Sequence, residues 1–194
     1  MTTTVALGEH FKRLLDFSGR EDRASFWPYA AVAFVLVMIA GALVFVPIAV
    51  TMLQAMQQFA AQHPESVTVT QGPGDYTVSM HGEHPAFVPI GWIILYFVVT
   101  FGSAVLLYAA AVARRLHDTG RSGLWGILPL PFILYSSVQM PRLFAAIGAG
   151  AEPDMTLFLS VFLSNLLYII TLLVLILLLA GKSTQRPNRF DKTA

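Results

Sequence analysis

Four long apolar runs divide the chain, and they constrain its fold more than any other feature. They cover residues 27–53, 87–113, 123–140 and 155–180, and none of them contains Asp, Glu, Lys, Arg or His. A helix needs about 20 apolar residues to cross the hydrocarbon core of a bilayer. The runs therefore predict one membrane domain over residues 1–194, an all-α protein built as a four-span transmembrane helix bundle.

Composition supports this assignment. Only 12% of the residues are charged, against about a quarter in soluble domains. Mean hydropathy is +0.66, and the chain has no cysteine, which excludes disulfides and thiolate nucleophiles. The third run is the shortest and contains Pro129 and Pro131, so we expect a kinked helix there, interrupted at Pro141-Arg142.

Residues 1–25 are polar, with apolar side chains spaced as one helical face. They predict an amphipathic N-terminal helix lying on the cytoplasmic surface of the membrane. We expect Ser25 to cap the first span, with Pro28 in its first turn.

The loop over residues 54–86 is expected to be extracytoplasmic, because residues 55–86 contain no Lys or Arg. Two alternating segments, 67–70 and 76–80, flank a Gly/Pro turn and predict a small β-hairpin. The same loop contains possible metal ligands. On a strand, neighbouring side chains alternate between the two faces, so these ligands would not form a compact site. We therefore interpret them as solvent-exposed loop residues, and no metal site is predicted. These residues are His63, Glu65, His81, Glu83 and His84.

Basic residues set the expected orientation. Four precede the first span, three lie in the hinge between the second and third spans, and four lie in the tail at 181–194. Four spans place eleven of the twelve basic residues on one side. The excess of Lys and Arg in cytoplasmic segments then predicts that both termini are cytoplasmic.

The hinge and its neighbouring segments supply the candidate contact residues. Guanidinium groups match phosphate geometry, and basic clusters at span ends bind lipid headgroups. The simpler alternative is that these arginines set topology and pair with nearby acids, with Asp118 as a shared acceptor. The candidate headgroup or partner contacts are Arg20, Arg23, Arg114, Arg115, His117, Asp118, Arg121 and Arg189.

Three motifs together resemble the YhaH-like family of small bacterial inner-membrane proteins, whose domain has no known function. The motifs are residues 19–27 (GREDRASFW), residues 114–125 (RRLHDTGRSGLW) and residues 187–190 (PNRF). The resemblance implies a multi-pass protein of the bacterial plasma membrane and brings no activity with it. The chain departs from the family pattern in its long 54–86 loop and at Ser183-Thr184-Gln185.

Three functions remain open on the sequence. The favoured one is a non-enzymatic scaffold or accessory subunit whose basic cytoplasmic face contacts membrane lipids, including anionic ones, or a protein partner or second copy. The alternative is a small channel or carrier for a neutral solute, using the polar face of the fourth run. Spans without ionisable residues argue against a proton-coupled pump.

The third possibility is a lipid-acting enzyme at the Arg/His/Asp surface. Adjacent residues on a helix point about 100° apart, so His117 and Asp118 do not form a dyad by adjacency. No catalytic residue, cofactor or nucleic-acid partner is predicted.

Overall fold

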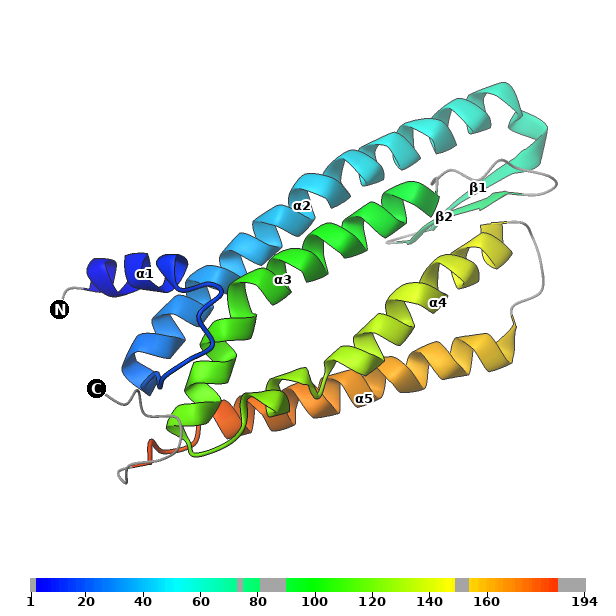
Figure 1. The fold of residues 1–194 in the computed structure, drawn as a ribbon. Coiled ribbons are helices and arrows are strands. Elements are labelled where there is room, and N and C mark those ends of the chain that lie inside the picture. Colours follow the sequence, from blue (N-terminus) through cyan, green and yellow to red (C-terminus); the bar gives the residue numbers. More distant parts are fainter. Residues whose placement is uncertain (1–2, 73–74, 81–89, 149–153, 185–194) are drawn as a thin grey trace.

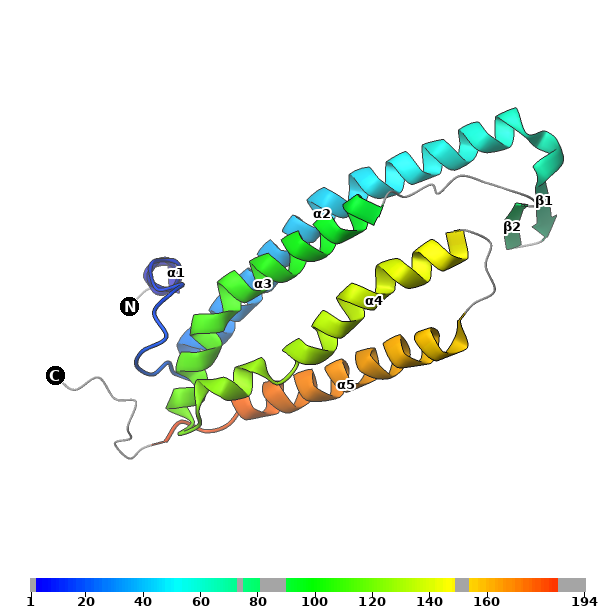
Figure 2. The ribbon, with the colours of Figure 1, turned by 45° about the vertical axis from the view of Figure 1, so that its right-hand side comes forward.

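The computed structural model describes residues 3–72, 75–80, 90–148 and 154–184 (Figure 1). Two helical hairpins dominate it: α2 (Arg23–Gln62) with α3 (Ile90–Asp118), and α4 (Leu130–Gly148) with α5 (Met155–Leu179). The two hairpins meet near the hinge after α3 and diverge away from it (Figures 1 and 2). The short helix α1 (Thr3–Lys12) lies beside the hinge end of α2.

Helix α2 begins four residues before the first apolar run and ends nine residues after it. Its N-cap is Asp22, whose carboxylate accepts from the backbone N–H of Ser25 at 2.8 Å, so the expected cap at Ser25 is wrong. The carboxylate satisfies a backbone donor that a helix start leaves unpaired. At 1.5 Å per residue its 40 residues extend roughly 60 Å, longer than a bilayer core of about 30 Å.

The hinge begins later than the apolar run suggests, because α3 continues to Asp118. Gly120 then turns the chain with φ +77°, a conformation that glycine adopts without a Cβ clash. The 3₁₀-helix η2 (Gly123–Ile127) follows and packs closely on α3: a Cβ built on Gly123 would lie 2.9 Å from the Cβ of Ala113.

The third run is divided between η2 and α4, with Leu128 and Pro129 in the break and Pro131 in the first turn of α4. Helix α4 continues through Pro141 to Gly148, so the interruption expected at Pro141-Arg142 is wrong. It pairs with α5 through the Ser164 hydroxyl, which donates to the backbone oxygen of Phe132 at 2.8 Å. Asp154 caps the start of α5.

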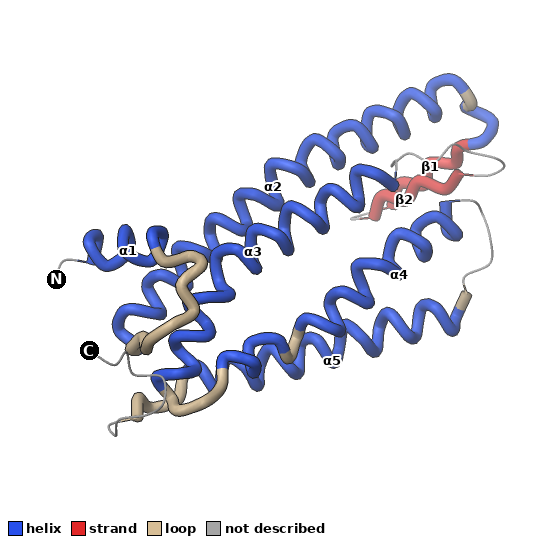
Figure 3. Tube along the Cα trace, viewed as in Figure 1, coloured by secondary structure: helices blue, strands red, loops and turns tan. Residues whose placement is uncertain are grey.

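Between α2 and α3 the described residues include the 3₁₀-helix η1 (Pro64–Ser66) and two strands, β1 (Val67–Gly72) and β2 (Asp75–Met80). The strands pair antiparallel, with Val67 opposite Met80 and Gly72 opposite Asp75. Figure 3 shows them as the red segment at the end of the molecule away from the hinge.

The packed core lies at the hinge end rather than along the whole bundle. Two tyrosines join α2 to α3 there: Tyr29 donates to the backbone oxygen of Leu107 at 2.6 Å, and Tyr108 donates to that of Ala30 at 2.7 Å. The buried core residues are Phe26, Tyr29, Ala30, Ala33, Ala111, Val112, Leu116, Leu175 and Leu179.

Away from this core, large apolar side chains point outward, as Leu43 at 72% and Leu177 at 71% exposure illustrate. Exposed apolar surface on this scale needs an apolar environment. Four helices are long and apolar enough to cross a membrane, and they begin and end at Arg23–Gln62, Gly91–Asp118, Gly123–Ala146 and Met155–Leu179.

Candidate functional site

Two adjacent arginines at the end of α3 form the centre of a polar cluster. Arg114 is 1% exposed and Arg115 is 0% exposed, although both belong to the basic segment of the hinge. A charge of this size is buried only where partners replace its hydration. The partners come from the segment before α2, from α3 itself, from the last residue of α5 and from the start of the tail.

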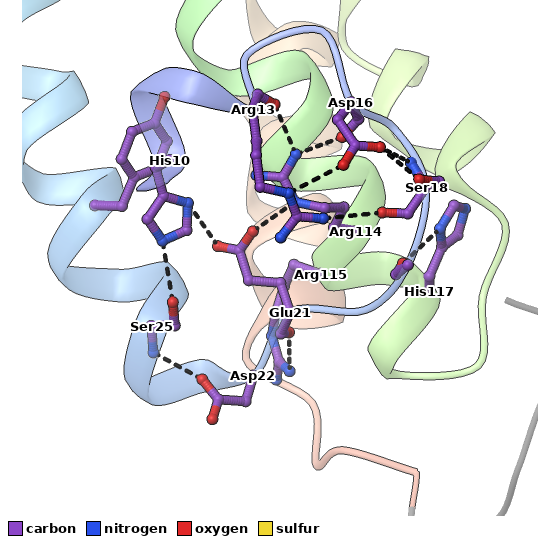
Figure 4. Close-up of polar contacts among 12 residues, drawn as sticks. His10, Arg13, Asp16, Ser18, Glu21, Asp22, Ser25, Arg114, Arg115 and His117 are labelled. Atoms are coloured by element: carbon purple, nitrogen blue, oxygen red, sulfur yellow. Dashed lines mark hydrogen bonds and ion pairs between the residues drawn. The ribbon is translucent and has the colours of Figure 1, made fainter. Parts of the chain in front are cut away.

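Arg114 connects α3 to the segment that precedes α2. Its Nε donates to Oε2 of Glu21 at 2.9 Å, and its Nη1 donates to the backbone oxygens of Arg13 and Asp16. The backbone oxygen of Arg114 in turn accepts from the N–H of Glu21 at 3.2 Å. Figure 4 shows the Arg114 side chain between α3 and the loop that follows α1.

Arg115 instead donates hydrogen bonds to carbonyl groups at the C-terminal end of α5. Its Nε donates to the backbone oxygen of Leu179 at 2.9 Å, and its Nη2 donates to that of Gly181 at 2.6 Å. The last carbonyls of a helix have no partner within the helix and carry partial negative charge, which favours a cation. A guanidinium from α3 therefore completes the C-terminus of α5.

Asp118 joins the segments because both of its oxygens accept. Oδ1 accepts from Nε and Nη2 of Arg20, each at 3.3 Å, and Oδ2 accepts from Arg115 and from the Ser183 hydroxyl at 2.5 Å. Its backbone oxygen accepts from the N–H of Thr184 at 2.9 Å. Asp118 is 5% exposed, so these bonds form out of water.

A second buried group holds α1 against α2. The His10 ring stacks on Tyr29 with centroids 4.4 Å apart; its Nε2 lies 3.0 Å from Oγ of Ser25 and its Nδ1 lies 3.5 Å from Oε1 of Glu21 (Figure 4). Burial, with Arg114 and Arg13 nearby, lowers the pKa of His10. Burial also raises the pKa of Glu21, against the opposing effect of Arg114.

The structure sorts the predicted contact residues into three groups. Arg114, Arg115 and Asp118 are buried, and they bond to other groups of the protein. Arg20 is partly exposed beside Asp118, and Nδ1 of His117 lies 3.2 Å from the backbone oxygen of Gly19.

Arg23 and Arg121 form the exposed group. Arg189 lies outside the described residues.

His117 and Asp118 contact different partners. Asp118 bonds to arginines and a serine, while His117 points to Gly19, so the pair is not arranged as a dyad. Among the described residues there is no group of three possible metal ligands. Three of the loop residues considered as ligands, at 81, 83 and 84, lie outside the described residues.

Sequence reasoning missed the contribution of the tail. Ser183 and Thr184, noted only as a departure from the family pattern, both bond to Asp118. It also gave no indication that Glu21 is buried: the residue is 6% exposed and accepts from Arg114. The sequence did contain a signal for both contacts: each segment adjoins a span that ends on the hinge side, so each could be expected near the hinge arginines.

Four membrane-length helices, outward apolar surfaces and a polar cluster confined to one end indicate the class: a multi-pass helical membrane protein. Within that class, the chain belongs to the family described as protein of unknown function (DUF805), whose model matches residues 14–192. No curated protein and no solved structure matches the chain.

Proposed function

We propose that this protein is a non-enzymatic scaffold or accessory subunit of the bacterial inner membrane. Both termini lie in the cytoplasm, and the hinge end contacts lipid headgroups or a partner protein. The orientation follows from the basic residues, since eleven of twelve lie in the segments that four spans place on one side.

The observation that carries the proposal is the internal pairing of the hinge-end cluster. Its acids accept from its arginines, and the arginines cap carbonyls from other segments. Groups held in this way stabilise one another and are poorly placed to exchange protons with a substrate. The cluster therefore supports a preformed surface rather than a reactive site.

The polar face of α5 favours this proposal over a solute path. Ser164 donates to Phe132 of α4, and the Tyr135 hydroxyl donates to Oγ of Ser160 at 3.0 Å. These hydroxyls bond across the α4–α5 hairpin, which is how polar side chains commonly join helices in lipid. Liposomes containing the protein are expected to pass small neutral solutes no faster than empty liposomes.

Site-specific photocrosslinking tests the proposed contact surface. A photoreactive residue replacing Arg121 should give lipid or protein adducts in cells, whereas the same residue replacing Arg142 at the other end of α4 should give fewer. Mass spectrometry of the adducts identifies the contact. Equal yields of the same adducts at both ends, or conversion of a lipid during incubation with the purified protein, would contradict the proposal.

A further inference from the structure

The end of α5 carries an exposed basic group in addition to the buried arginines. Nη1 of Arg23 donates to the backbone oxygen of Ala180 at 3.3 Å. Nη1 of Arg121 would lie 3.7 Å from a Cβ built on Gly181, and Lys182 is the next residue. Three exposed cations, from the start of α2, the hinge and the tail, thus converge on residues 180–182.

Two acids lie close in sequence to Arg23 and Arg121, and both accept hydrogen bonds from other groups. Asp118 accepts from Arg20, Arg115 and Ser183, and Asp22 caps α2 through Ser25. Within the part of the chain that the structure describes, Arg23, Arg121 and Lys182 form no ion pair with an acid. Among the described residues these three cations therefore have no carboxylate partner, and an external anion can take that place.

The position of the group selects the kind of anion. Arg23 precedes the first apolar run, Arg121 follows α3, and Lys182 lies three residues after the last residue of α5. All three lie where apolar helices end, which is the level of lipid headgroups. The bond from Arg23 to Ala180 uses one of the five guanidinium donors, so others are available for the two-pronged contact that phosphate favours.

We infer that Arg23, Arg121 and Lys182 form a binding site for the phosphate of an anionic phospholipid headgroup. The inference rests on the proposed function and specifies the ligand of its hinge-end surface. Arg115 shapes the site indirectly, because it holds the carbonyls of Leu179 and Gly181, on either side of the Ala180 carbonyl to which Arg23 donates.

Native mass spectrometry of the full-length protein in a neutral detergent tests the site, with short-chain phosphatidylglycerol as the probe and phosphatidylcholine as the neutral comparison. One basic residue near an anionic surface contributes about 1 kcal/mol, which is roughly fivefold in affinity. Arg121→Gln and Lys182→Gln should each weaken phosphatidylglycerol binding about fivefold, and the triple variant with Arg23→Gln roughly 100-fold. Phosphatidylcholine binding should not change.

Lys12→Gln is the matched control, because Lys12 is an exposed cation at the same end, 74% exposed and paired with Glu9. It should bind phosphatidylglycerol as the unmodified protein does. An equal loss in Lys12→Gln would show that only total charge matters and would overturn the site. The Arg121→Gln/Lys182→Gln double variant keeps the bond from Arg23 to Ala180, so it separates binding from folding.

Competition distinguishes the source of the phosphate. Excess inorganic phosphate should not displace phosphatidylglycerol, and displacement would assign the site to a soluble anion instead. Unchanged lipid binding in the triple variant would overturn the inference while leaving the proposed function intact, since the surface can still contact a protein. Lipid turnover or crosslinks unrelated to the hinge end would instead overturn the proposed function.

Discussion

Replacing the buried Asp118 with asparagine should destabilise the protein more than the same kind of change at an exposed acid. Asp118 accepts at both oxygens, from Arg20 on one and from Arg115 and Ser183 on the other. Asparagine keeps one acceptor, turns the other oxygen into a donor and removes the charge. One guanidinium would then face an N–H group in a site that is 5% exposed.

The expected cost follows from burial. Removing one partner of a buried ion pair costs roughly 3–5 kcal/mol, because the remaining charge keeps its desolvation penalty. Arg115 retains the Leu179 and Gly181 carbonyls, which places the expected loss near the lower end, about 3 kcal/mol. An exposed ion pair would cost only about 0–1 kcal/mol.

Equilibrium unfolding with a denaturing detergent in mixed micelles gives the measurement, with tryptophan fluorescence as the signal. Asp154→Asn is the matched control: Asp154 is an exposed N-cap that accepts from the N–H groups of Thr156 and Leu157. Asparagine caps a helix about as well as aspartate, so this variant should lose only a few tenths of a kcal/mol. Equal losses in the two variants would refute the argument that Asp118 joins three segments of the chain.

Three further predictions concern proton binding, topology and packing. Because the pKa of His10 is lowered in the folded protein, the folded state favours the neutral ring. The contribution of His10 to stability is therefore complete above the ordinary histidine pKa, and it is lost as the pH falls through the pKa of His10 in the folded protein. His10→Gln should therefore reduce the loss of stability between about pH 7 and 5, measured by the same unfolding assay; an unchanged pH profile would contradict this. In this cysteine-free chain, Gly74→Cys should react with an impermeant thiol reagent in intact spheroplasts, and Ser122→Cys only after permeabilisation. External labelling of Ser122→Cys would break the four-span topology. Gly123→Ala places a Cβ 2.9 Å from the Cβ of Ala113 in α3 and should lower the free energy of unfolding by about 1–3 kcal/mol. Gly102→Ala is the control, because a Cβ there has nothing within 4 Å, and it should not destabilise the protein. Equal stability of the two variants would argue against the close packing of η2 on α3.

The sequence alone determined the number of membrane-length helices and the segments that belong to one end. Hydropathy and the distribution of Lys and Arg are sums over local windows, so they do not depend on which helices pack together. For the same reason the sequence indicated that Asp118 lies among arginines. It could not select which ones: Arg20 and Arg115 donate to Asp118, whereas Arg23 contacts Ala180.

Only the tertiary structure decided which charges are exposed. Arg114 and Arg121 belong to the same basic motif in the sequence. Arg114 is nevertheless 1% exposed and donates to Glu21, whereas Arg121 lies at the surface. In the structure α4 also continues through Pro141, where the usual helix-breaking effect of proline predicts an interruption. For the arginines the outcome depends on partners supplied by distant segments, because a buried guanidinium is stable only where carboxylates and carbonyls from elsewhere in the chain replace its water.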